Sequence, residues 1–214
     1  PALLSRSDAL HRLTRDGRAA LAGLGIRTVV DLRSGLDRRI GGRDRLRGVD
    51  ARLHRIPIHA GGLDPSTIEI RRVYRAILGE EGAAVGAAIR TIAEADGPIV
   101  VHCTAGKDRT GLVVALTLLA VGVDADRVVA DYALTERNLA GAWTEGMLRR
   151  VRRFRVPMND RLLEVLAHSP EPVLRETLAW VDAEHGGVPA YLDSVGVGEP
   201  VVARLRDRLV RPGG

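Results

Sequence analysis

The only cysteine of this 214-residue chain lies in a segment suited to binding phosphate. Cys103 and Arg109 occupy the two ends of a CX5R motif within residues 102–111, HCTAGKDRTG, here called the phosphate loop. A thiol attacks only as the thiolate, which needs positive potential from loop N–H groups, a helix N-terminus and a nearby cation. The guanidinium of Arg109 can also hold two phosphoryl oxygens in its planar fork. These residues predict attack of Cys103 on a phosphorus atom held by Arg109.

Other residues of the phosphate loop have predicted roles around the same phosphorus atom. Thr110 can donate a hydrogen bond to the sulfur, helping it to leave when a phosphocysteine is hydrolysed. Gly106 and Gly111 permit a tight backbone and the close approach of the next helix. The predicted phosphate-binding residues are Thr104, Ala105, Gly106, Lys107, Asp108 and Arg109.

A proton must reach the leaving oxygen, and two carboxylates are candidates for supplying it. Asp108 lies on the loop itself and is the first candidate for general acid, then for base towards the attacking water. Asp31 is the second, because it ends a predicted neighbouring strand and could reach the same cleft or orient Arg109. An alternative role for Asp31 is an ion pair with Arg33 that ties down the strand end.

Three loop residues also have structural interpretations. A lone cysteine before an apolar helix is often a small buried hydrophobe, but the spacing of Arg109 and Thr110 favours a nucleophile at Cys103. His102 is expected to pack beneath the loop and fix its shape rather than donate a proton. Lys107, the only lysine, is either a solvated charge or a contact to a second phosphate at the substrate rim.

The length and composition favour one soluble domain over residues 1–214, and the order of its predicted strands and helices favours an α/β fold. Apolar residues make up 45% and charged residues 28%, whereas aromatic residues are only 3%, too few for a base-stacking nucleic-acid surface. The net charge of +5 favours phosphorylated partners. One cysteine permits no intrachain disulfide and no four-thiolate zinc site, and no cofactor is expected. Without a secretory signal or an apolar run of about 20 residues, the predicted location is the cytoplasm, with export left open.

The hydrophobic pattern alternates strands and helices up to the phosphate loop. Two short helices are expected near Ser7 and over 16–24, and an exposed connection over 35–50. Pro57 places the second strand at an edge or a strand end. The other predicted elements are strands at 26–33, 52–58 and 98–102 and helices at 65–78, 83–95 and 112–121.

The second half of the chain is predicted to be helical. Asp124 should cap a helix that reaches 137, a helical pair broken at Pro157 and Pro170 should occupy 143–185, and two short helices should follow. Residues 139–185 are a candidate helical insertion or lid. Leu148, Val151 and Phe154 recur at helical spacing, which suits a helix that covers a pocket. The arginines of this segment form either a solvated face or a patch for anionic lipid, namely Arg149, Arg150, Arg152, Arg153 and Arg155.

The phosphate loop resembles the signature of the cysteine-dependent protein tyrosine phosphatase superfamily. The Lys107-Asp108 pair is similar to that of bacterial tyrosine and lipid phosphatases of the triple-specificity kind. Similarity to that bacterial family continues in residues 6–10, 24–33, 131–135 and 191–192. The resemblance implies a mostly parallel sheet flanked by helices and a metal-free mechanism. It also implies activity on phosphotyrosine, with phosphoserine, phosphothreonine and phosphoinositides as further substrates.

Two departures from the superfamily bear on the fold and the acid. Nothing resembles the Trp-Pro-Asp loop that carries the acid in eukaryotic tyrosine phosphatases, so the assignment to Asp108 depends on the loop alone. Little of the family's upstream strand precedes Arg6, so the first strand is expected to be missing or differently formed. The rival functions are a phosphate-binding module without catalysis and a sulfurtransferase. Arsenate reduction by a disulfide relay would need further thiols.

Overall fold

Four parallel strands form the centre of the computed structural model, which describes residues 3–59, 64, 67–153 and 155–210. The sheet order is β1-β4-β2-β3. All strands are parallel, so their carboxyl ends meet at one edge of the sheet, where open α/β sheets bind ligands. The strands are β1 (Leu4–Ser7), β2 (Thr28–Asp31), β3 (Arg52–Arg55) and β4 (Ile99–His102).

Strand β1 corrects two expectations for the start of the chain. Leu4–Ser7 pairs with β4, so the first strand is present and Ser7 ends it rather than capping a helix. Only a single 3-10 turn follows, at Leu10–Arg12, and it has no side-chain cap. Beyond the strand, the Ala9 N–H donates to the Thr104 carbonyl at 3.2 Å, which ties β1 to the phosphate loop.

The connection over 35–50 is not simply exposed, as the sequence analysis predicted. Helix α2 (Gly35–Gly41) forms there because Ser34 and Asp37 make a reciprocal capping box. Asp44, which follows α2, has a side chain only 2% exposed. The edge position predicted from Pro57 is confirmed, because β3 pairs with β2 alone.

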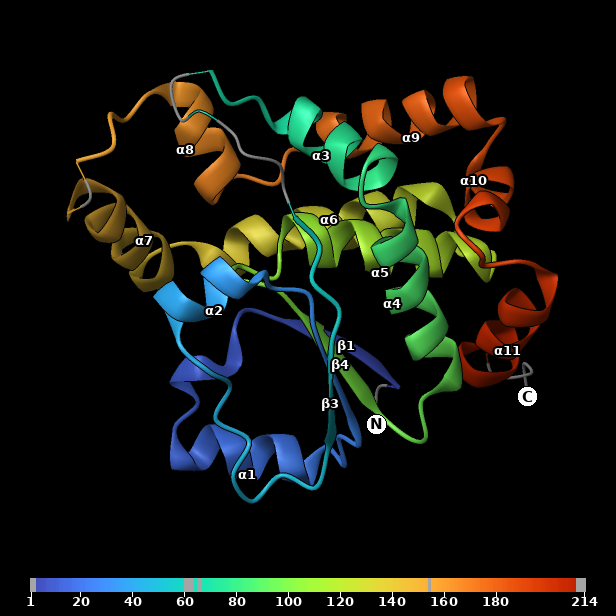
Figure 1. The fold of residues 1–214 in the computed structure, drawn as a ribbon, viewed down its shortest axis with the longest axis horizontal. Coiled ribbons are helices and arrows are strands. Elements are labelled where there is room, and N and C mark those ends of the chain that lie inside the picture. Colours follow the sequence, from blue (N-terminus) through green and yellow to red (C-terminus); the bar gives the residue numbers. More distant parts are fainter. Residues whose placement is uncertain (1–2, 60–63, 65–66, 154, 211–214) are drawn as a thin grey trace.

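Helices cover both faces of the sheet (Figure 1). Alternate residues of the central strands belong to the two hydrophobic clusters on these faces. Val29 and Val100 pack with Leu10 and Ile26 on the side of α1 (Arg15–Gly23). Val30 and Val101 face the larger core with the helices on the opposite side. The first of those helices are α3 (Ile70–Gly79), α4 (Gly82–Glu94) and α5 (Asp108–Ala120), close to the predicted ranges, although residues 65 and 66 lie outside the described part.

The rest of the chain is helical, with one correction. The predicted breaks at Pro157 and Pro170 are present, but they separate three helices rather than a pair. Asp124 caps its helix as predicted. No helix of the described residues is long and apolar enough to cross a membrane. These helices are α6 (Ala125–Leu139), α7 (Ala142–Arg153), α8 (Asp160–Ala167), α9 (Glu171–His185), α10 (Val188–Ser194) and α11 (Glu199–Leu209).

Candidate active site

The phosphate loop runs from the last residue of β4 into the first turn of α5 and forms the floor of a cavity of about 380 Å³, here called the Cys103 cavity. Cys103 is 2% exposed and lies at the carboxyl end of β4, beside the N-terminus of α5. This is the arrangement that the sequence predicted, although the helix starts at Asp108, four residues before the predicted range of 112–121. Of the predicted site residues, the cavity is lined by Cys103, Thr104, Ala105, Asp108 and Arg109.

Steric contacts explain why glycine occupies both predicted positions of the loop. Gly106 has a φ of +69°, and a Cβ there would lie 2.3 Å from the Ser7 carbonyl oxygen at the end of β1. A Cβ on Gly111 would lie 3.0 Å from the ring of Tyr132. Position 106 therefore requires glycine, whereas a side chain at position 111 would have to displace the Tyr132 ring.

Arg109 spans the loop and is held by a carboxylate that the sequence analysis did not identify. Its Nη2 donates to Thr104 Oγ1 at 3.2 Å, and its Nη1 donates to Asp37 Oδ2 at 2.7 Å. Burial alone would lower the pKa of Arg109, but the charges of Cys103 and Asp37 raise it. Asp37, and not Asp31, therefore positions Arg109, and the Ser34-x-x-Asp37 spacing was the available signal for this residue.

Asp37 is strongly held in its ionised form. Its Oδ2 accepts hydrogen bonds from Ser34 N and Ser34 Oγ, both at 2.9 Å, besides the one from Arg109. Burial alone would raise the pKa of Asp37, but the charge and hydrogen bond of Arg109 lower it below its ordinary value. The capping box of α2 thus fixes the carboxylate that orients the phosphate-binding arginine.

Asp108 lines the Cys103 cavity, and two donors hold one of its oxygens. Tyr74 Oη donates to Asp108 Oδ1 at 2.9 Å, and Lys107 Nζ donates to the same oxygen at 2.7 Å. Lys107 also donates to the His168 carbonyl at 2.8 Å and is fully buried. Neither interpretation of Lys107 is correct, because this lysine lies beneath the loop and not on a solvated surface or at the substrate rim.

Asp31 does not reach the Cys103 cavity. Its side chain is fully buried, and both carboxylate oxygens accept hydrogen bonds from Arg33, at 2.9 and 3.0 Å. The carboxylate turns under the sheet edge because Arg33, two residues on, is buried beside it. The ion-pair interpretation of Asp31 fits this geometry, whereas a proton donor to a substrate does not.

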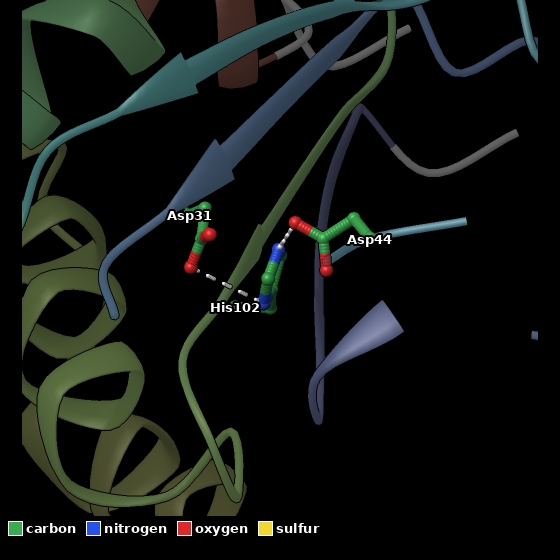
Figure 2. Close-up of side chains that lie close together, drawn as sticks. All are labelled: Asp31, Asp44 and His102. Carbon is green, nitrogen blue, oxygen red and sulfur yellow. Dashed lines mark ion pairs between the residues drawn. The ribbon is translucent and has the colours of Figure 1, made fainter. Parts of the chain in front are cut away.

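A buried ion-pair network lies beneath the phosphate loop (Figure 2). His102 is fully buried, with Nε2 3.4 Å from Asp44 Oδ2 and Nδ1 3.9 Å from Asp31 Oδ1. Its Nδ1 is also 3.2 Å from the Cys103 carbonyl oxygen, so His102 packs under the loop as predicted. Burial alone would raise the pKa of Asp44, but the charges of His102 and Arg33 lower it.

Asp31, Asp44 and His102 also present ligand atoms within 4.8 Å of one another, as a metal site would. Arg33, however, places its guanidinium between the two carboxylates and donates to Asp44 Oδ1 at 2.9 Å as well as to Asp31. The trio is thus accounted for as part of an ion-pair network that includes Arg33. Asp44 has no sequence signal, because it lies in a Gly- and Arg-rich stretch that resembles an exposed loop.

Thr110 is fully buried, and its Oγ1 has no hydrogen-bond partner among the described residues. A free hydroxyl in the first turn of α5 is available to a ligand atom or to the sulfur. The hydrogen bond from Thr110 to Cys103 stays a prediction.

Two helices of the predicted insertion form the wall of the Cys103 cavity opposite the loop. Trp143, Met147 and Arg150 come from α7, and Val165 and Leu166 come from α8. Figure 1 shows both helices at the end of the molecule that holds α2. A lid role for residues 139–185 stays a prediction.

The five arginines predicted as one group separate into two. Arg150 is partly buried and lines the Cys103 cavity. The other four are exposed, as a solvated face requires, namely Arg149, Arg152, Arg153 and Arg155. Phe154 lies outside the described residues. Binding of anionic lipid by this face stays a prediction.

Comparison with known proteins agrees with the geometry of the loop. Residues 1–211 match the model of the tyrosine phosphatase family. The chain belongs to that family. This phosphatase is 29% identical to the triple specificity protein phosphatase PtpB of Mycobacterium tuberculosis, over 98% of the chain and 91% of the relative. It is 28% identical to a tyrosine-protein phosphatase of Nostoc commune, over 97% of the chain and 74% of the relative.

Proposed function

We propose that this phosphatase hydrolyses phosphotyrosine through a phosphocysteine on Cys103, and that it also accepts phosphoserine, phosphothreonine or phosphoinositides. The observation that carries the proposal is the meeting of Cys103 and Arg109 on the floor of one cavity, where the charge of the thiolate acts on the guanidinium. The similarity to a triple specificity phosphatase supports the wider substrate range.

The proposed reaction has two displacements at phosphorus. In the first, the Cys103 thiolate forms the S–P bond while the P–O bond to the leaving group breaks, and Asp108 gives its proton to the leaving oxygen. In the second, water forms the new P–O bond, the S–P bond breaks, and Asp108 takes the proton of the water. Arg109 and the loop amides hold the phosphoryl oxygens, and Thr110 stabilises the departing sulfur.

The cavity suits an aromatic phosphate ester. Its wall carries apolar side chains, among them Ile68, Val73 and Leu166, which can enclose a phenyl ring above the loop. The buried position of Cys103 at the floor favours a substrate long enough to reach the sulfur. These contacts favour phosphotyrosine as the first substrate class.

Asp108→Asn is expected to lower kcat on phosphotyrosine peptides by about 100-fold or more, because the leaving phenoxide then lacks its proton donor. Asp31→Asn should leave the chemical step much less affected, since Asp31 lies outside the cavity. Steady-state hydrolysis of phosphotyrosine, phosphoserine and phosphoinositide substrates, with reductant and without metal, measures both variants. A greater loss of kcat in correctly folded Asp31→Asn would assign the acid to Asp31 instead.

Arg150→Ala is expected to raise KM for phosphoinositides about fivefold with little change in kcat, because a partly buried cation in the cavity wall can contact anionic groups beyond the reacting phosphate. Arg149→Ala is the matched control, because Arg149 is on the same helix but pairs with Glu145 and does not line the cavity. Equal KM values for the two variants would remove Arg150 from the substrate site.

A further inference from the structure

Asp108 is joined to two buried tyrosines from helices that lie far apart in the sequence. Tyr74 comes from α3 and Tyr132 from α6, and their hydroxyl oxygens are 2.6 Å apart. Tyr74 Oη also lies 2.9 Å from Asp108 Oδ1. Both rings are buried, at 0% and 1% exposure, and they meet edge to face. A continuous hydrogen-bond chain therefore runs from the core to the carboxylate in the Cys103 cavity.

The direction of the hydrogen bonds in this chain is fixed by proton count. A phenol has one proton, and the proton of Tyr74 is committed to Asp108 Oδ1, so Tyr132 must donate to Tyr74 Oη. Burial, and then the charge of Asp108, raises the pKa of both tyrosines well above the ordinary value. The two hydroxyls thus keep their protons and act as fixed donors.

Lys107 is the second donor to Asp108 Oδ1. Its Nζ donates to that oxygen at 2.7 Å and to the His168 carbonyl, just after α8, at 2.8 Å. With Oδ1 occupied by two donors, the other oxygen of Asp108 is left to carry the proton that reacts. The charged or titratable groups around Asp108 are Lys107, Arg109, Tyr74 and Tyr132, with Cys103 on the same cavity floor.

We propose that Tyr74, supported by Tyr132, is a positioning residue for the general acid. It turns Asp108 so that Oδ2 faces the leaving group, and its donated hydrogen bond stabilises the carboxylate formed when the proton departs. The inference rests on the proposed function, because it assigns a proton-transfer role to Asp108. Tyr74 acts through Asp108 and touches no reacting atom.

The test compares a poor and a good leaving group. In Tyr74→Phe, kcat on phenyl phosphate should fall about tenfold, whereas kcat on p-nitrophenyl phosphate, which needs little protonation, should change less than about twofold. The basic limb of the pH profile on phenyl phosphate should move up by about one pH unit, because the carboxylate loses a donor and holds its proton more tightly. Tyr132→Phe should change kcat and the pH profile in the same direction, by a smaller amount.

Two controls separate positioning from general damage. Tyr191→Phe also removes a buried phenol hydroxyl, which donates to the Leu78 carbonyl at 2.9 Å, and should change neither the leaving-group ratio nor the pH profile. In the Asp108→Asn background, Tyr74→Phe should cause no further loss on phenyl phosphate, because the proton that Tyr74 helps to direct is absent.

Failure of the inference differs from failure of the proposed function. If the wild type hydrolyses neither ester, the proposed function is wrong. If Asp108→Asn shows the leaving-group effect but Tyr74→Phe lowers kcat equally on both esters, or changes kcat on neither, the positioning role is wrong and the proposed function stands. A full additional loss of kcat when Tyr74→Phe is combined with Asp108→Asn would also overturn the positioning role.

Discussion

Replacement of Cys103 by serine is expected to abolish hydrolysis of every phosphate ester that the wild type cleaves. Loss of the nucleophile should lower kcat by about four orders of magnitude or more, as in other enzymes that lose the attacking side chain. Serine differs from cysteine by one atom, and Cys103 forms no disulfide, so the fold should survive. Steady-state hydrolysis without metal and with fresh reductant measures the loss.

The same variant distinguishes the rival functions. Arg109, Thr104 and the loop amides remain in Cys103→Ser, so this variant should still bind a phosphotyrosine peptide that it does not cleave. A phosphate-binding module would show such binding without turnover in the wild type as well. A sulfurtransferase would produce thiocyanate from thiosulfate and cyanide, and the wild type should not. Retained phosphate release by Cys103→Ser would exclude Cys103 as the nucleophile.

The largest expected loss of stability is at Arg33, the centre of the network beneath the loop. Arg33→Met leaves the buried carboxylates of Asp31 and Asp44 without their shared cation, which should lower the free energy of unfolding by about 3–5 kcal/mol. Arg39→Met, an exposed position on α2, should change it by less than about 0.5 kcal/mol. Urea denaturation followed by circular dichroism measures both. Equal stability of the two variants would show that the network contributes little.

The network also predicts how stability depends on pH. The pKa of Asp44 is lower in the folded protein than its value of about 3.9 in an unfolded chain. The folded state therefore binds fewer protons at this group, and its contribution is complete above pH ~4 and is lost as the pH falls through the folded pKa. The pKa of Asp37 is also lowered in the folded protein, so its contribution to stability depends on pH in the same direction. Asp44→Asn should flatten the decline of stability below pH 4 relative to the wild type.

The catalytic loop was predictable because its function depends on local spacing. Cys103, Gly106 and Arg109 each have a role that only certain residue types can fill, at positions fixed by one strand, one turn and one helix. The strand before the loop is continuous and apolar, and the helix after it is apolar on every side, so both are recognisable without tertiary information.

The supporting residues were harder to predict because their partners lie far away in the sequence. Asp44 belongs to a polar stretch that resembles solvent-exposed loop, and only the cation of Arg33 and the ring of His102 make its burial favourable. Lys107 is charged, and nothing local indicates that Asp108 and the His168 carbonyl bury it. Strand β1 is four residues long and forms because β4 pairs with it, which no local pattern reveals.

Asp31 illustrates how a correct element can lead to a wrong role. The strand that it ends was predicted, and its carboxyl end does lie beside the phosphate loop. The direction of the side chain, however, is decided by Arg33, which pairs with both carboxylate oxygens and turns them under the loop. Asp37, six residues later, takes the place beside Arg109 because the capping box of α2 presents it there.

The measurement that tests the central claim most directly is the detection of the phosphocysteine. The phosphatase is mixed with p-nitrophenyl phosphate, quenched within the first turnovers, and its peptides are analysed by mass spectrometry under conditions that preserve a thiophosphate. The account predicts one phosphoryl group on Cys103, absent from Cys103→Ser. Steady turnover with no protein-bound phosphate, or with the phosphate on another residue, would contradict it.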